Sequence, residues 1–113
     1  MGTGLTLEQT PLQRITLPNN LTIRNISEIY STVGEAFTSS FSLCLDIPAG
    51  AQIDLSFVQM IEALRRQARD DHKDLTLAGP VQDNLATILR QAGLWDGLEA
   101  DDKKFWLHEG VAQ

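Results

Sequence analysis

Apolar and polar residues alternate in two short segments near the start of the chain. Residues 12–18 (LQRITLP) follow this pattern, and residues 21–25 (LTIRN) follow it again. A period of two is typical of a strand with one buried face. The turn-forming sequence Pro-Asn-Asn at 18–20 lies between the two segments. Together these features predict a β-hairpin.

Three later segments place apolar residues at intervals of three and four, the spacing of one helix face. Asn25 and Glu28 resemble a capping box before the first helix. The second helix is expected to start near Ser56, and the third follows the Gly-Pro pair at 79–80 and should end at Gly93. The three apolar faces consist of Ile26, Ile29, Tyr30, Val33, Ala36 and Phe37, of Val58, Ile61, Leu64 and Ala68, and of Leu85, Ile88, Leu89 and Ala92.

Two further strands are predicted between these helices. Residues 41–47 (FSLCLDI) are almost wholly apolar, as in a strand covered on both faces, and residues 75–79 (LTLAG) form another short segment. The order strand-strand-helix-strand-helix-strand-helix predicts one α/β domain with right-handed parallel crossovers. The residues that we expect to be buried are Leu43, Cys44, Leu45, Ile61, Leu64, Leu75, Leu77, Leu85 and Leu89.

The composition limits the classes of partner and compartment. The chain has 15 acidic against 9 basic residues, a net charge of −6, so nucleic acid is not expected as a partner. Its apolar runs are far shorter than the roughly 20 residues that span a bilayer, so no membrane insertion is expected. Cys44 is the single cysteine, which excludes an internal disulfide. Because residues 1–10 (MGTGLTLEQT) carry no secretory signal, we expect a cytoplasmic protein.

Sequence motifs of catalysis and cofactor binding are missing. The chain contains no G-x-S-x-G serine elbow, no G-x-G-x-x-G sequence and no P-loop lysine motif. The two histidines, His72 and His108, fall in a charged loop and in the C-terminal segment. A single cysteine does not build a zinc site. We therefore expect no enzyme activity, no cofactor and no metal.

Ser56 has two compatible interpretations. Ser56 and Gln59 fit the S-x-x-Q capping box, in which the serine hydroxyl accepts a hydrogen bond from the amide three residues later. The start of a helix also suits a phosphate, because free amide groups and the helix dipole stabilise an anion. Phosphorylation adds a charge of about −1.5 to −2. Asp46 and Asp54 lie close by in sequence, so repulsion between these charges could switch the binding of a partner.

Residues 43–94 carry several landmarks of one known family. Asp46 ends an apolar strand, Asp54 follows after a short loop, and the segments LAGP and QAGL stand at a later turn and helix end. In this order and spacing, residues 12–94 resemble a STAS domain, the family of sulfate transporters and anti-sigma factor antagonists. The resemblance implies a mixed, mostly parallel β-sheet of about four strands packed with three to four helices. It also implies a domain at residues 1–94 and a C-terminal extension at residues 95–113.

The resemblance further implies a bacterial protein–protein interaction switch of the anti-sigma factor antagonist type, acting in transcription or chemosensory signalling. Its partner would be a serine kinase-type anti-sigma factor or another signalling protein, and the family's phosphorylated position corresponds to Ser56. The candidate partner-binding residues are Asp46, Asp54, Leu55 and Phe57. Leu55 and Phe57 depart from the family pattern, which has Ser or Thr and then Gly at these positions. Phe57 could anchor a partner or pack under the start of the helix.

Two alternative functions stay open within the same resemblance. One is a constitutive adaptor subunit of a lipid-transport ABC system, although Leu55 replaces the hydroxyl that such subunits use for docking. The other is a domain that senses a small ligand.

The C-terminal extension is rich in aromatic residues, among them Trp95 and Trp106. Leu94, Leu98 and Phe105 could share one helix face. This segment is expected either to dock on the domain as a short helix or to serve as an aromatic partner-binding element.

Overall fold

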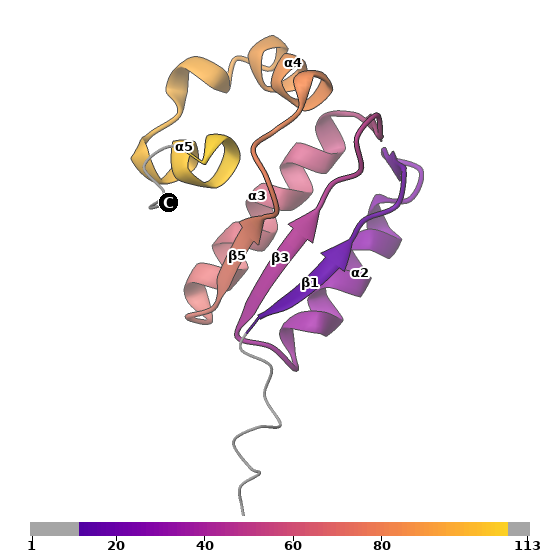
Figure 1. Ribbon diagram of the computed structural model, residues 1–113, viewed down its shortest axis with the longest axis vertical. Coiled ribbons are helices and arrows are strands. Elements are labelled where there is room, and N and C mark those ends of the chain that lie inside the picture. The colour runs from indigo at the N-terminus through magenta and orange to yellow at the C-terminus, as the bar shows by residue number, and fades with distance from the viewer. Residues whose placement is uncertain (1–11, 109–113) are drawn as a thin grey trace, which may run out of the picture.

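The computed structural model describes residues 12–108, and parallel strands form its centre (Figure 1). β1 (Gln13–Thr16), β3 (Ser42–Asp46) and β5 (Asp74–Leu77) make a three-stranded sheet in the order β1-β3-β5. β2 (Asn20–Leu21) and β4 (Gln52–Ile53) make a second, two-stranded sheet. The expectations for residues 1–11 and 109–113 lie outside the described residues; they include the expected lack of an N-terminal secretory signal and the end of the C-terminal extension.

Helices α2 (Ile26–Phe37) and α3 (Leu55–Asp70) cover the same face of the three-stranded sheet (Figure 1). After β5 come α4 (Asp83–Gln91), the 3-10 helix η1 (Trp95–Gly97) and α5 (Ala100–Leu107), with α5 beside β5. Every strand pair is parallel within the described part of the chain. The prediction of an α/β fold is confirmed.

The predicted hairpin at residues 12–25 is wrong, because the chain does not reverse at Pro18. β1 and β2 do not pair with each other: β1 pairs with β3 and β2 pairs with β4, and both pairs are parallel. The N–H of Leu17 still donates to the carbonyl oxygen of Asp46 at 2.9 Å, but Pro18 has no N–H to continue this ladder. The proline therefore interrupts the pairing rather than turning the chain. The segment after β3, expected as a loop, contains the partner strand β4.

β3 has one buried and one open face, although the sequence predicted coverage on both. Leu43 and Leu45 point towards the helices and are fully buried, whereas Ser42, Cys44 and Asp46 alternate with them and stay partly exposed. The prediction that Cys44 belongs to the core is wrong. Its face of the sheet carries no helix among residues 12–108 (Figure 1).

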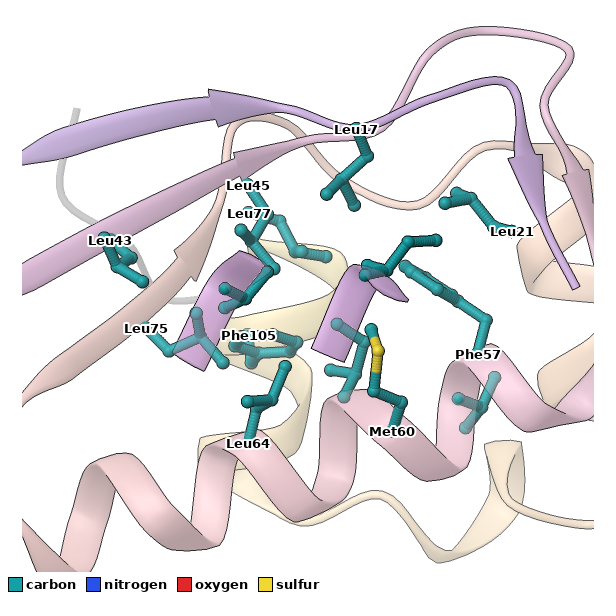
Figure 2. Packing of buried hydrophobic residues seen from close by; sticks show 14 of the residues in the cluster. Leu17, Leu21, Leu43, Leu45, Phe57, Met60, Leu64, Leu75, Leu77 and Phe105 are labelled. Carbon is teal, nitrogen blue, oxygen red and sulfur yellow. The ribbon is translucent and has the colours of Figure 1, made fainter. Parts of the chain in front are cut away.

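The hydrophobic core lies between the three-stranded sheet and the helices (Figure 2). Leu43 and Leu45 of β3 and Leu75 and Leu77 of β5 face Leu64 of α3. Apart from the cysteine, every residue that the sequence predicted as buried is buried. Burial of such a leucine contributes about 1.5–3 kcal/mol, which makes this layer the main source of stability.

Helix α5 adds its aromatic residues to the same core. Phe105 and Trp106 are buried and meet edge to face, with ring centroids 5.0 Å apart. The N–H of Val81 donates to the carbonyl oxygen of Trp106 at 2.9 Å. The expectation that Leu94, Leu98 and Phe105 share one helix face is wrong. η1 and α5 are separate helices, and the backbone is extended at Leu98, where ψ is 128°.

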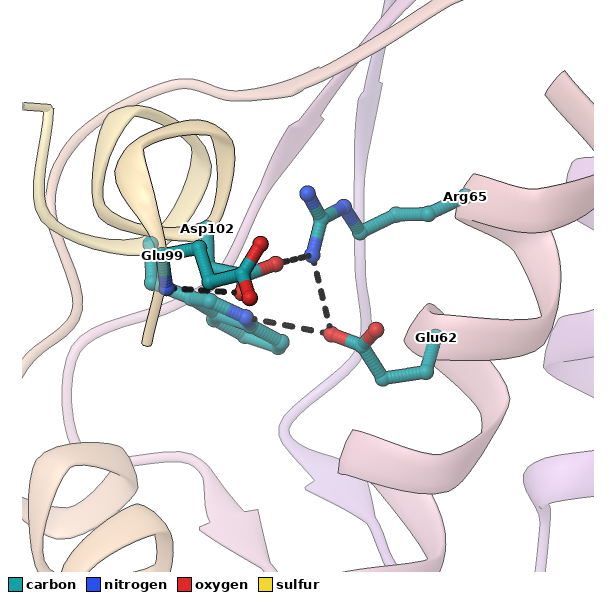
Figure 3. Close-up of polar contacts among 5 residues, drawn as sticks. Glu62, Arg65, Glu99 and Asp102 are labelled. Atoms are coloured by element: carbon teal, nitrogen blue, oxygen red, sulfur yellow. Dashed lines mark hydrogen bonds and ion pairs between the residues drawn. The ribbon is translucent and has the colours of Figure 1, made fainter. Parts of the chain in front are cut away.

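A polar network joins α5 to α3 (Figure 3). One carboxylate oxygen of Glu62 accepts from Arg65 at 3.1 Å and from the indole N–H of Trp106 at 3.2 Å. Arg65 also donates to Asp102 at 2.9 Å, and the other oxygen of Asp102 accepts from the N–H of Glu99 at 3.0 Å. The hydrogen bond from Glu99 lowers the pKa of Asp102, burial opposes this, and Arg65 lowers it further.

Helices α3 and α4 end in the same way, with a left-handed residue after the last turn. At the end of α4 this residue is Gly93, with φ 76°, as predicted, and at the end of α3 it is His72, with φ 58°. In both cases the next amide reaches back to a carbonyl oxygen five residues earlier, as in a Schellman motif. The bonds are Leu94 N–H to Leu89 O at 2.9 Å and Lys73 N–H to Ala68 O at 2.7 Å.

The capping box predicted for α2 is wrong. Asn25 precedes the helix with φ −127° and ψ 18°, outside the extended region typical of a capping residue, and its side chain makes no capping bond. Its Nδ2 instead donates to the carbonyl oxygen of Asn20 at 2.8 Å. The asparagine thus fastens the connection between β2 and α2.

Candidate functional site

Helix α3 begins at Leu55, and Asp54 is its N-cap. Asp54 has an extended backbone, with φ −130° and ψ −177°, and its Oδ1 accepts from the N–H of Ser56 at 3.0 Å. A side chain that satisfies a free amide of the first turn performs the capping role. The interpretation of Ser56 as the cap of an S-x-x-Q box is therefore wrong, because Ser56 lies inside the first turn.

The hydroxyl of Ser56 also donates to Oδ1 of Asp54. The acceptor is a carboxylate, so this is a charge-assisted hydrogen bond. Ser56 is half-buried. A group attached to the serine oxygen would remove the proton that makes this bond.

The second carboxylate oxygen of Asp54 binds a distant part of the chain. Oδ2 accepts from the backbone N–H of Ile23 at 3.0 Å, across 31 positions in sequence. Asp54 also donates its own N–H to the carbonyl oxygen of Leu21 at 3.4 Å. One aspartate therefore joins the segment after β2 to the start of α3. Sequence reasoning missed Ile23, because no local pattern marks a backbone amide whose acceptor is so far along the chain.

The surroundings of Asp54 favour its charged form. Partial burial raises the pKa of this carboxyl, but hydrogen bonds from the Ser56 hydroxyl and from backbone N–H groups outweigh it, so the pKa is lowered. The N–H groups belong to Ile23, Ser56 and Phe57. The positive end of the helix dipole favours the same charge state. The site therefore holds a carboxylate at neutral pH.

Two apolar side chains flank this carboxylate at the surface. Leu55, the next residue after Asp54, is 43% exposed, and Ile23 is 68% exposed. Phe57 is fully buried under the start of α3, close to Leu21 in the core (Figure 2). Phe57 is therefore a core residue and offers no surface for a partner. We call Ile23, Asp54, Leu55 and Ser56 the α3 entry site.

Asp46, the remaining sequence candidate, lies apart from the α3 entry site in its contacts. It ends β3 on the open face of the sheet and pairs with Arg14 at 2.8 Å. Among residues 12–108, no hydrogen bond or ion pair connects it to Asp54 or Ser56. A cavity of about 180 Å³ opens beside it, lined also by Gln82 and Asn84. This is smaller than the roughly 300–1,000 Å³ of typical ligand pockets, so the cavity beside Asp46 does not favour a ligand site there.

The two histidines lie away from the α3 entry site. His72 follows the last turn of α3, and Ser56 lies in its first turn. The helix has 16 residues, a length of about 24 Å. Nε2 of His108 lies 3.1 Å from the carbonyl oxygen of Leu77, at the edge of β5. Neither histidine is placed to take a proton from Ser56 in this structure.

Comparison of the chain with protein-family models, with curated proteins and with solved structures gives no match. None of the helices in residues 12–108 has the length and apolar character needed to cross a membrane. In the same part of the chain, no three His, Cys, Asp or Glu side chains gather as potential metal ligands.

Proposed function

We propose that this chain is a non-enzymatic protein–protein interaction switch of the STAS type, resembling the anti-sigma factor antagonists, and that phosphorylation of Ser56 operates it. The supporting observation is the bond from the Ser56 hydroxyl to Asp54, since the same carboxylate holds the segment at Ile23. The parallel α/β fold agrees with this proposal at the level of fold class.

The chemistry of the α3 entry site gives the switch a mechanism. A phosphate on Ser56 removes the proton that is donated to Asp54 and puts a charge of about −1.5 to −2 beside the carboxylate. Like charges in contact repel, whereas the amide groups and dipole at the helix start accept the phosphate. The phosphate therefore displaces Asp54 as the helix cap. Asp54 then releases the N–H of Ile23, and the surface between the two segments changes.

The partner surface in this proposal is the unmodified α3 entry site. Its exposed Leu55 and Ile23 provide apolar contact area, and Asp54 provides a fixed negative charge. Apolar residues at the centre of an interface with charge at its rim are typical of partner surfaces. The partner would be a serine kinase-type anti-sigma factor or another signalling protein of the bacterial cytoplasm. Phosphorylation would weaken binding through added charge and through movement of Ile23.

A kinase assay tests the modification itself. The purified chain is incubated with the protein kinase encoded nearest to its gene, and the phosphorylated residue is mapped by mass spectrometry. We expect phosphate on Ser56 in the unchanged chain and in Ser31→Ala, a control at an exposed serine of α2. We expect none in Ser56→Ala. Failure of the unchanged chain to accept phosphate, or modification that persists in Ser56→Ala, would contradict the proposal.

One observation favours a second candidate, a constitutive adaptor such as the subunit of a lipid-transport ABC system. The Ser56 hydroxyl is half-buried and already bonded within the chain, as expected of a structural residue that is never modified. Purification from cells separates the two functions. An adaptor would copurify with an ATPase subunit equally well in unchanged and Ser56→Ala forms, whereas a switch would copurify with a kinase.

A further inference from the structure

A groove runs along the outer edge of β5, between the second half of α3 and α5, with a volume of about 520 Å³. We call it the β5 groove. It uses none of the residues of the α3 entry site. Its lining residues are Arg65, Ala68, Arg69, Lys73, Asp74, Leu75, Thr76, Leu77, Asp101, Lys104, Phe105 and His108.

The outer edge of β5 faces this groove. β5 is the last strand of its sheet, and no strand in residues 12–108 pairs with this edge. The N–H groups of Asp74 and Ala78 donate to β3 and its flanking residue at 2.9 and 2.8 Å. In a parallel strand the N–H and C=O groups of one residue point to the same neighbouring strand, and those of the next residue point to the opposite side. Since Asp74 and Ala78 face β3, the backbone groups of Leu75 and Leu77 point outwards. His108 contacts the carbonyl oxygen of Leu77. Among residues 12–108, no hydrogen bond to the outer side uses the two groups of Leu75 or the N–H of Leu77, so these three groups can pair with an added strand.

The floor of the groove is apolar. Ala68, Leu75, Leu77 and Phe105 are each less than a tenth exposed and belong to the core. The guanidinium group of Arg65 stacks over the ring of Phe105, 4.5 Å from its centroid, and closes one wall. An apolar floor beside free strand edges suits a segment that alternates apolar and polar side chains.

The charge of the groove is opposite to that of the whole chain. Its lining has Arg65, Arg69, Lys73 and Lys104 against Asp74 and Asp101, in a protein with a net charge of −6. Arg65 is already paired with acidic residues of α3 and α5. Arg69 and Lys104 are exposed and make no ion pair within residues 12–108. These two cations stand on the two helices that border the groove, so the site is complementary to an acidic ligand.

We propose that the β5 groove binds an extended, acidic segment of a partner protein, which adds to β5 as a further strand. The backbone of Leu75 and the N–H of Leu77 pair with the segment, its apolar side chains face Phe105 and Ala68, and its carboxylates meet Arg69 and Lys104. β5 has four residues, so the paired segment is about four residues long, roughly 13 Å. This second interaction does not depend on Ser56.

Binding of designed peptides tests the proposal. The probe is a dye-labelled hexapeptide of alternating Glu and Val, followed by fluorescence anisotropy. Its controls are the same peptide with Lys for Glu and the same peptide with Pro for Val, which cannot donate to a ladder. We expect only the Glu-Val peptide to bind, and we expect its binding to weaken at high salt. In its presence, hydrogen exchange at the Leu75 amide should become slower. Equal binding of the three peptides, or no binding of the acidic one, overturns the proposal.

Matched variants locate the site. We expect Arg69→Glu and Lys104→Glu each to weaken binding about tenfold, because each puts a like charge against the ligand. Arg66→Glu is the control, since Arg66 is exposed on the same helix and does not line the groove. Thermal melts confirm that each variant is folded. An effect of Arg66→Glu as large as that of Arg69→Glu overturns the proposal.

Two other occupants give distinct results, and each overturns the partner proposal. If only a chain ending at His108 binds the acidic peptide, the chain's own residues 109–113 compete for the groove. If the unchanged chain dimerises in sedimentation experiments and Arg69→Glu abolishes the dimer, a second copy fills it. Ser56→Ala should bind the peptide as the unchanged chain does, so this proposal and the switch at Ser56 fail independently.

Discussion

Replacement of Asp54 by alanine should destabilise the protein more than replacement of Ser56. The carboxylate of Asp54 accepts from the N–H of Ser56, the hydroxyl of Ser56 and the N–H of Ile23. Loss of an N-cap costs about 1 kcal/mol, and loss of each further hydrogen bond about 0.5–1.5 kcal/mol. Asp54→Ala should therefore lower the free energy of unfolding by about 2–4 kcal/mol.

Ser56→Ala removes only one of these three bonds. Asp54 still accepts from the N–H groups of Ser56 and Ile23, so the expected loss is about 0.5–1.5 kcal/mol. Asp54→Asn should fall between the two variants. Asparagine caps a helix as well as aspartate does, but the amide nitrogen that replaces Oδ2 cannot accept from Ile23.

Urea unfolding at pH 7, followed by circular dichroism, measures these differences. Asp96→Ala is the control, since Asp96 is an exposed aspartate of η1 and a surface change of this kind stays within about 0.5 kcal/mol. The m-values should agree among the variants, so that the differences report the native state. If Ser56→Ala proves as costly as Asp54→Ala, Ser56 is the cap after all and the geometry of the α3 entry site is wrong.

Three other properties follow from the same structure. The pKa values of Asp54 and Asp102 are lowered in the folded chain. The stability that these two carboxylates contribute is therefore present above the unfolded pKa of about 3.9 and is lost as the pH falls through the folded pKa values. In urea unfolding between pH 7 and 3, the double variant Asp54→Asn/Asp102→Asn should lose less stability than the unchanged chain. His72→Gly should raise the free energy of unfolding by about 0.5–1 kcal/mol, because φ is positive at His72; a decrease in thermal melts would contradict this. Leu64→Ala should cost about 2–5 kcal/mol, because Leu64 is fully buried between α3 and the sheet, and a loss under about 1 kcal/mol would show that it is not a core residue.

The helices were predictable from sequence because their signals are local. The apolar spacing around Ile29 and Val33 identified α2, and Gly93 marked the end of α4 correctly. Pairing between strands is a long-range property, and local turn residues at Pro18 suggested a reversal that does not occur. Which face of the sheet the helices cover also depends on contacts between residues far apart in sequence. The apolar run around Cys44 could not show that helices pack on only one face.

The sequence pointed to Asp54 and Ser56 as candidates, but it gave the capping role to Ser56, whereas in the structure Asp54 caps α3. Ser56 with Gln59 and Asp54 with Ser56 are both reasonable capping patterns, and only the backbone conformation at Asp54 decides between them. Ile23 could not be found, because its contribution is a backbone amide. Phe57 could be a surface anchor or a core residue by sequence, and its complete burial decides for the core.

The most direct test of the switch is the affinity of the phosphorylated chain for its partner. Phosphoserine is incorporated at position 56. Binding to the kinase that phosphorylates Ser56 in the assay proposed above is then measured by calorimetry for the phosphorylated chain, the unmodified chain and Ser56→Asp. We expect phosphorylation to weaken binding by at least about tenfold, since like-charge contacts at an interface cost several kcal/mol. We also expect faster hydrogen exchange at the Ile23 amide. Equal affinity of the three forms, with the Ile23 amide equally protected, would contradict a switch at Ser56.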